Sequence, residues 1–130
     1  MVKKVLVVDD SELIHSMYKL ILKKYSGCET LKAMNGKEAL DLLTREKNVD
    51  IILLDINMPV MNGIQFLEIA KKQASTRTIP VIIISTEGKE EDTLRGLGLG
   101  ASGYIVKPFK SSQLHALIET IIGKTVDAPA

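Results

Sequence analysis

Polar side chains that could together form a binding site follow several short apolar runs of the chain, at the point where each run ends. They are Asp9 and Asp10 after Val5–Val8, Asp55 after Ile51–Leu54, Ser85 after Val81–Ile84, and Lys107 after Tyr104–Val106. A carboxylate that loses water without gaining a partner is costly, so two acids side by side at the end of a buried strand call for a positive group.

These residue types together favour magnesium. Three carboxylates, one hydroxyl and one ammonium leave about two net negative charges, which a divalent cation would neutralise. Oxygen donors without clustered His or Cys form the ligand set that Mg²⁺ prefers, with waters and phosphate oxygens as its other ligands. Magnesium beside a carboxylate and a lysine indicates phosphoryl chemistry, in which one Asp could act as the nucleophile and form an aspartyl phosphate. Taken singly, each residue also fits a solvated cap, turn or strand exit.

This chemistry depends on the apolar runs forming one sheet. Their continuous apolarity is typical of parallel strands covered on both faces, and the weaker run Thr30–Ala33 fits an edge strand. Apolar residues recur at helical spacing between the runs, so strand and helix alternate five times. The helical stretches include Leu13–Ile21, Ala39–Leu43, Phe66–Ala70, residues 89–103 and Leu114–Ile122. We therefore predict an α/β fold with a doubly wound five-stranded parallel sheet in the flavodoxin-like order 2-1-3-4-5 and five helices, its strand ends converging at one edge.

Local signals mark the helix ends. Asn35 and Asn62, each followed by glycine, precede helical stretches. Gly96 and Gly98 each cost about 0.5–1 kcal/mol relative to alanine inside the fourth helix, so this helix is expected to be marginal. Gly100 can serve as its C-cap.

Length and composition describe an ordinary single domain. The chain has 130 residues, 17 basic and 16 acidic side chains and a net charge of +1, which argues against direct nucleic-acid binding through bulk charge. Cys28 is the only cysteine, so an internal disulfide is impossible and a reducing compartment is expected. The first apolar run is too short for a signal peptide or a membrane span. We expect a cytoplasmic protein without membrane insertion, with one domain at residues 1–124 and a disordered tail at 125–130.

The motifs VLVVDD, DIILLDINMPVMNG, IPVIIIST and GASGYIVKPF, in this order and spacing, resemble the receiver domains of response regulators, in particular the CheY-like single-domain type of chemotaxis. The resemblance covers the chain from about Lys3 to Gly123. It implies a two-component signalling switch that takes a phosphoryl group from a histidine kinase or a small phosphodonor. Such a switch is not an enzyme, although it promotes its own phosphorylation and dephosphorylation. The implied target is a downstream protein, such as a flagellar motor switch or a phosphorelay protein, and a monomer is expected.

Carried over residue by residue, the resemblance makes Asp55 the phosphoacceptor. Asp10 would ligate Mg²⁺ directly and Asp9 directly or through water, while Asp55 and the backbone carbonyl of Asn57 would complete the protein's share. Lys107 would hold a phosphoryl oxygen.

The resemblance also assigns a switch. Spacing to GASGY favours Ser85 as the family's hydroxyl, which leaves Thr86 where a smaller residue is common and access to the phosphoryl group would be narrower. Phosphorylation would draw Ser85 inward and move Tyr104 from an exposed to a buried position, changing the face formed by the fourth helix, fifth strand and fifth helix. Asn57 and Glu87 would tune self-dephosphorylation.

Two smaller expectations concern the peptide and side chains around this site. The Lys107-Pro108 peptide is expected to be cis, by resemblance. His15 and His115 fall on different helices, and we expect them to face solvent rather than form a site.

Two other functions stay open on the same architecture. A flavodoxin-like electron carrier needs a Ser/Thr/Gly-rich loop after the first strand, where this chain has DDSELI, and usually aromatics against the flavin, yet tryptophan is absent. An aspartate-nucleophile phosphatase of the haloacid dehalogenase type places an acid two residues after its nucleophile. Ser11 and Asn57 occupy those positions after Asp9 and Asp55. A receiver could be a stand-alone regulator or part of a longer protein.

Overall fold

Five strands alternate with five helices in the computed structural model, which describes residues 2–56, 58, 61–86 and 88–126. The elements are β1 (Lys4–Val8), α1 (Glu12–Leu22), β2 (Glu29–Ala33), α2 (Gly36–Arg45), β3 (Ile51–Asp55), α3 (Gly63–Lys72), β4 (Val81–Ser85), α4 (Glu90–Gly98), β5 (Gly103–Val106) and α5 (Ser111–Val126). α5 therefore continues two residues past the expected domain end at 124. None of the helices in the described ranges is both long and apolar enough to cross a bilayer.

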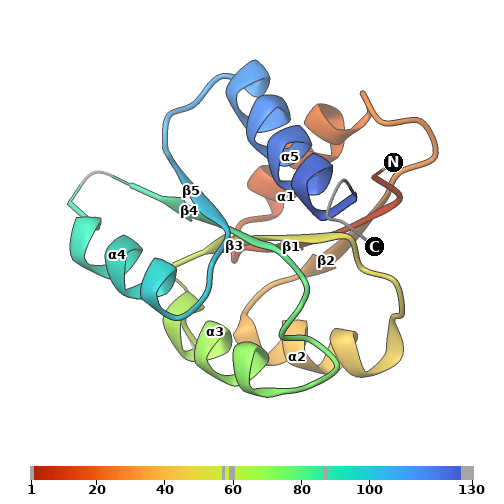
Figure 1. Ribbon diagram of the computed structural model, residues 1–130. Coiled ribbons are helices and arrows are strands. Elements are labelled where there is room, and N and C mark those ends of the chain that lie inside the picture. Colours follow the sequence, from red (N-terminus) through yellow and green to blue (C-terminus); the bar gives the residue numbers. More distant parts are fainter. Residues whose placement is uncertain (1, 57, 59–60, 87, 127–130) are drawn as a thin grey trace.

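The strands form one parallel sheet in the order β2-β1-β3-β4-β5, which confirms the predicted order (Figure 1). β1 lies between β2 and β3, with Val5 opposite both Thr30 and Ile51. β2 is an edge strand, as expected for its half-polar sequence. Because all strands run in the same direction, their carboxyl ends meet at one edge of the sheet.

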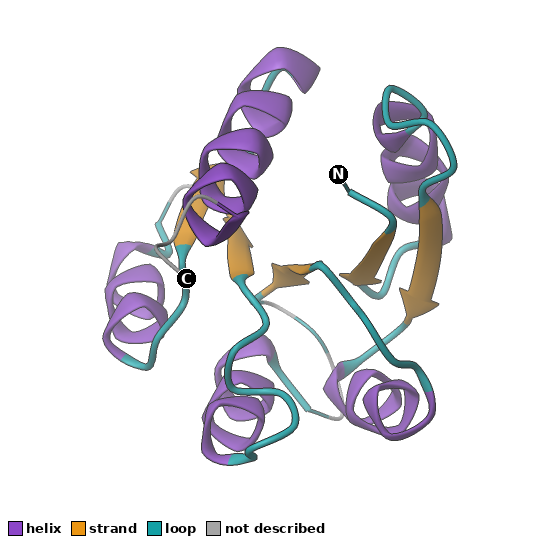
Figure 2. Cartoon of the chain, turned by 45° about the vertical axis from the view of Figure 1, so that its right-hand side comes forward, coloured by secondary structure: helices purple, strands orange, loops and turns teal. Residues whose placement is uncertain are grey.

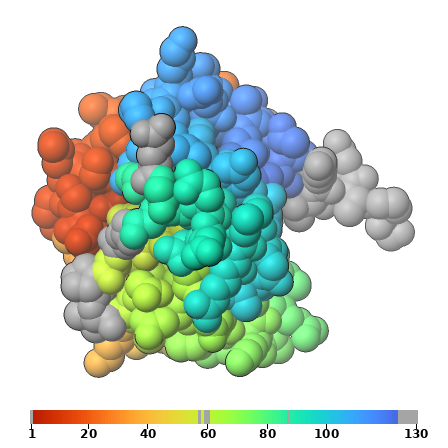
Figure 3. Space-filling model, turned by 90° about the vertical axis from the view of Figure 1, so that its left-hand side faces the viewer, coloured from red at the N-terminus to blue at the C-terminus, as the bar shows by residue number. Residues whose placement is uncertain are grey.

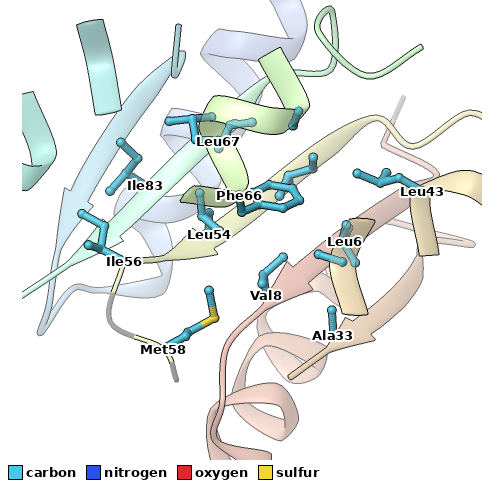
Figure 4. Packing of buried hydrophobic residues seen from close by; sticks show 14 of the residues in the cluster. Leu6, Val8, Ala33, Leu43, Leu54, Ile56, Met58, Phe66, Leu67 and Ile83 are labelled. Carbon is cyan, nitrogen blue, oxygen red and sulfur yellow. The ribbon is translucent and has the colours of Figure 1, made fainter. Parts of the chain in front are cut away.

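Helices cover both faces of the sheet, with α1 and α5 on one side and α2, α3 and α4 on the other (Figures 1 and 2). Alternate residues of each central strand enter opposite layers of the core. Leu6, Leu54 and Ile83 pack with Phe66 in the layer beneath α2 and α3 (Figure 4). The continuous apolar runs are therefore explained by burial on both faces.

Asparagine side chains start two helices, as the sequence predicts. The Asn35 side chain accepts the backbone N–H of Glu38 at 2.9 Å at the start of α2. Asn62 and Gln65 form a reciprocal capping box at the start of α3. Gly63 follows because a Cβ there would lie 2.6 Å from the backbone oxygen of Asp55. The start of α3 thus sits tightly against the end of β3.

Close packing explains one of the two glycines inside α4. A Cβ on Gly96 would collide with the Cδ1 atom of Ile83 on β4, whereas Gly98 faces open space. Gly96 therefore lets α4 approach the sheet, at a cost in helix propensity. Lys89 at the N-cap provides no side-chain hydrogen bond, and Gly100 ends the helix at φ +113°. The C-cap itself is Leu99, one residue before the predicted Gly100, which follows it in the left-handed conformation. The marginal stability of α4 stays a prediction.

The expectation that both histidines face solvent is wrong. His15 is buried between α1 and the sheet, and its Nε2 lies 2.8 Å from the backbone oxygen of Asp9. His115 is half-buried, and its Nε2 lies 2.7 Å from the backbone oxygen of Ile21. Each histidine occupies an inward-facing helix position because its ring nitrogen can donate to a backbone carbonyl that would otherwise lack a donor.

Candidate metal-binding and phosphoacceptor site

Asp9, Asp10 and Asp55 converge at the carboxyl edge of the sheet. Each offers a carboxylate oxygen, and these three oxygens all lie within 4.8 Å of one another. The pairing of β1 with β3 brings them together, since Val8 lies opposite Leu54 one position earlier. Asp9 is buried, Asp55 is half-buried and Asp10 is exposed, so the cluster opens to solvent on one side.

The two carboxylate oxygens of Asp9 have different surroundings. Oδ1 accepts the backbone N–H of Ser11 at 2.9 Å. Oδ2 is buried without a hydrogen-bond partner and lies 3.6 Å from the Nζ atom of Lys107. This ammonium is too distant for a strong hydrogen bond but contributes charge. A buried acceptor that lacks a donor, beside two further carboxylates, fits a small divalent cation that binds oxygen.

Ser85 and Lys107 lie at the ends of the two neighbouring strands, β4 and β5. The backbone N–H of Lys107 donates to the carbonyl of Ser85 at 2.7 Å, which ties the two strand ends together. Ser85 is buried, whereas Thr86 is exposed. The Lys107-Pro108 peptide is cis, as expected. The structure thus brings the predicted hydroxyl and ammonium to the same edge as the three acids.

Tyr104 lines a cavity of about 280 Å³ between α4 and β5, and its side chain is 50% exposed. Ser85 lines the same cavity, together with Thr93, Leu94 and Val106. Figure 3 looks onto this side of the molecule, with α4 near its centre and α3 beneath it. The cavity therefore connects the strand-four hydroxyl with the exposed aromatic ring.

A second hollow, a groove of about 760 Å³, opens beside Asp10 between α3 and α4. Ile56 and Met58 contribute apolar surface near the acidic cluster. Farther along, Arg95 on α4 and Glu68 on α3 form an ion pair at 3.1 Å. The groove leaves the acids accessible to a small molecule from this side.

Two predicted site residues, Asn57 and Glu87, lie outside the described residues. Two residues that the sequence reasoning missed, His15 and Tyr18, lie behind Asp9 on the inner face of α1. Burial raises the pKa of the Tyr18 hydroxyl, and the charges of Asp9 and Asp55 raise it further. The sequence contained one indication of this arrangement: the two residues are three positions apart, which places both on one side of a helix.

The chain matches the family described as the response regulator receiver domain over residues 5–119, and it belongs to that family. It is 35% identical to a chemotaxis protein CheY homolog of Campylobacter jejuni, over 92% of each chain. It is 38% identical to the phosphate regulon transcriptional regulatory protein PhoB of Klebsiella pneumoniae, over 94% of this chain and 52% of PhoB.

Solved structures agree with this assignment. The chemotaxis protein CheY4 of Vibrio cholerae has a TM-score of 0.83 and 34% identity, over 93% of this chain and 99% of CheY4. The receiver domain of a histidine kinase from Syntrophus aciditrophicus has a TM-score of 0.85 and 31% identity, over 98% of this chain and 95% of that domain. Similar receivers thus occur in proteins with different outputs, and the chain is a signalling regulator of the two-component type.

Proposed function

We propose that this chain is a phosphorylation-activated switch that accepts a phosphoryl group from a histidine kinase on Asp55, with Mg²⁺ bound at the acidic cluster. The convergence of Asp9, Asp10 and Asp55 within 4.8 Å of one another, beside Lys107, carries the proposal. Three carboxylates at this separation repel one another, and a divalent ion would remove that repulsion.

Asp55 provides the nucleophile. One of its carboxylate oxygens attacks phosphorus as the bond from phosphorus to the donor's nitrogen or oxygen breaks, and the electron pair leaves with the donor. Asp9, Asp10, Asp55 and the backbone carbonyl of Asn57 would hold Mg²⁺, and the bound ion would neutralise charge on the phosphoryl oxygens. Lys107, now beside Asp9, would turn its ammonium toward a phosphoryl oxygen.

The switch uses the cavity between α4 and β5. Ser85 donates its hydroxyl to a phosphoryl oxygen, and the space that it leaves admits the ring of Tyr104. The Tyr104 ring then passes from its half-exposed position into the cavity, and the face formed by α4, β5 and α5 changes shape and binds a target. The common lining of this cavity by Ser85 and Tyr104 supports the coupling.

We further propose that the target belongs to chemotaxis, such as a flagellar motor switch, and that the protein works in the cytoplasm as a monomer. The similarity to the chemotaxis protein CheY homolog, at 35% identity over 92% of this chain, supports this choice. Asn57 and Glu87 would set the lifetime of the phosphoryl group by tuning self-dephosphorylation.

Incubation with acetyl phosphate tests the reaction. With Mg²⁺ present, intact mass analysis should show one phosphoryl group per chain, and chelation of the metal with EDTA should abolish the label. A flavodoxin-like carrier would take up none. A phosphatase would instead hydrolyse many equivalents of acetyl phosphate without stable labelling, and either result would rule out the proposal.

A further inference from the structure

Buried polar atoms without a partner occur on α1 and on the acid that precedes it. Within residues 2–56, 58, 61–86 and 88–126, three buried side-chain atoms lack a hydrogen-bond partner: Asp9 Oδ2, His15 Nδ1 and Tyr18 Oη. The buried hydroxyl of Thr76, by contrast, donates to the carbonyl of Ala70 at 2.6 Å. Because buried polar groups are normally paired, a cluster of exceptions marks a region that serves another purpose than stability.

His15 contacts the backbone of a proposed metal ligand. Its Nε2 lies 2.8 Å from the backbone oxygen of Asp9, and the ring is 6% exposed. A carbonyl oxygen only accepts, so Nε2 is the donor in this contact. The carbonyl belongs to the peptide that joins Asp9 to Asp10. His15 therefore fixes the plane of the peptide from which both carboxylates project.

Tyr18 lies one helical turn farther along α1 and is 1% exposed. Its ring stacks on Phe109, with 6.3 Å between ring centroids and 22° between planes. Phe109 stands two residues after Lys107, so the stack joins α1 to the segment that carries the ammonium. The hydroxyl of Tyr18 is buried without a hydrogen-bond partner, so it is available as a donor to a neighbouring acceptor.

We propose that His15 and Tyr18 are positioning residues that hold Asp9 for metal binding, His15 through the Asp9 carbonyl and Tyr18 as a hydroxyl donor from the buried side. The inference rests on the proposed function, since it requires Mg²⁺ at the acidic cluster. Asp9 would present a carboxylate oxygen to the ion, and the Tyr18 hydroxyl would donate to the same carboxylate from the interior. Outer partners of metal ligands typically change metal affinity by about 10- to 100-fold.

The two histidines provide a matched test by calorimetric titration with MgCl₂. His15→Leu removes the donor to Asp9, and the Mg²⁺ dissociation constant should rise about tenfold. His15→Gln places an amide N–H near the position of Nε2 and should stay within about twofold of wild type. His115→Leu removes the equivalent bond to Ile21 and should lower the unfolding midpoint without changing Mg²⁺ affinity. Should His15→Leu fail to fold, His15→Asn, whose amide is too short to reach the carbonyl, replaces it.

The two tyrosines provide a second matched pair. Tyr18→Phe removes only the hydroxyl and keeps the stack on Phe109, so it should weaken Mg²⁺ binding at least threefold without lowering the metal-free unfolding midpoint. Tyr25→Phe removes a hydroxyl that bonds Glu119 at 2.8 Å, away from the acids. It should lower the midpoint and leave Mg²⁺ affinity unchanged.

These measurements separate failure of the inference from failure of the proposed function. If wild type binds Mg²⁺ and both His15→Leu and Tyr18→Phe bind it equally well, the positioning role is refuted while the metal site stands. A His15→Gln variant as weak as His15→Leu would also refute the role of the Nε2 donor. If wild type binds no Mg²⁺, both the proposed function and the inference fall.

Discussion

The aspartates at the two edges of the sheet differ in the hydrogen bonding of their carboxylates. At the amino edge, Asp50 precedes β3, and its Oδ2 accepts the backbone N–H groups of Lys3 and Lys4 at 2.7 and 2.9 Å. At the carboxyl edge, Asp9 follows β1, and its Oδ2 has no hydrogen-bond partner. Asp50 therefore joins the backbone of β1 to the start of β3, whereas Asp9 retains one carboxylate oxygen that can bind a cation.

The same contrast appears along α1. Near its C-terminal end, Glu119 accepts from both Lys24 and Tyr25 at 2.8 Å, and these two bonds lower the pKa of Glu119. Within α1, the Nδ1 atom of His15 and the hydroxyl of Tyr18 are buried without a partner. Polar side chains thus have hydrogen-bond partners where they serve only stability, whereas buried polar atoms beside the acids lack them. Four predictions test this division.

Loss of an acid at the carboxyl edge should have the largest effect on metal binding. Asp10→Asn should reduce Mg²⁺ affinity on the order of a hundredfold, because a direct ligand matters at least as much as outer partners that cost 10- to 100-fold. Its metal-free unfolding free energy should not fall, since one of three like charges is removed. Calorimetric titration and urea denaturation measure the two quantities. Wild-type Mg²⁺ affinity in this variant would remove Asp10 from the site.

Loss of the acid at the amino edge should do the reverse. Asp50→Ala should lower the unfolding free energy by about 2 kcal/mol, since hydrogen bonds to a charged group contribute about 1.5–3 kcal/mol. Mg²⁺ affinity should stay at the wild-type value, because Asp50 lies at the opposite edge. The same titration and denaturation apply, and a metal effect comparable to that of Asp10→Asn would erase the contrast between the edges.

Packing under α4 offers a test with no charge involved. Gly96→Ala should lower the unfolding free energy by about 1 kcal/mol, because overpacking of about 1–3 kcal/mol outweighs the gain in helix propensity. Ile83→Val removes the colliding Cδ1 atom, so the double variant should recover part of the loss. Gly98→Ala, which meets open space, should instead add about 0.5–1 kcal/mol. Equal effects at both glycines in denaturant titrations would contradict the close approach of α4.

The smallest effect concerns alkaline pH. Burial raises the pKa of both Tyr18 and Tyr25 above the ordinary value of 10.0. The unfolded chain therefore loses these protons first, and the folded state is stabilised below pH 10 but loses stability as the pH rises above it. Denaturation between pH 9 and about 11 should show this fall, shallower in Tyr25→Phe and in Tyr18→Phe. If the unfolding free energy falls as steeply in both variants as in wild type, the effect comes from other groups.

The sequence predicted the sheet and the positions of the acids because both follow from local patterns. Continuous apolar runs identify strands buried on both faces, and the residue after each run must lie at the carboxyl edge. Asp9, Asp10 and Asp55 were therefore expected together, and the structure places them so.

His15, Tyr18 and Gly96 could not be interpreted in the same way. Helical spacing shows which side of α1 is apolar, yet it gives no reason to place a histidine on that side. The reason is the carbonyl of Asp9, which contacts the Nε2 atom of His15, and this contact becomes apparent only when α1 lies on the sheet. Likewise, the propensity cost of Gly96 was visible in the sequence, whereas its contact with Ile83 on another element was not.

Phosphoryl incorporation into wild type and Asp55→Asn, measured side by side, tests the central claim most directly. Both proteins would be treated with acetyl phosphate and MgCl₂ and analysed by intact mass and by peptide mapping. Wild type should carry its label on the peptide that contains Asp55, and Asp55→Asn should carry none. Equal labelling of the two proteins, or a label on another residue in wild type, would contradict the account.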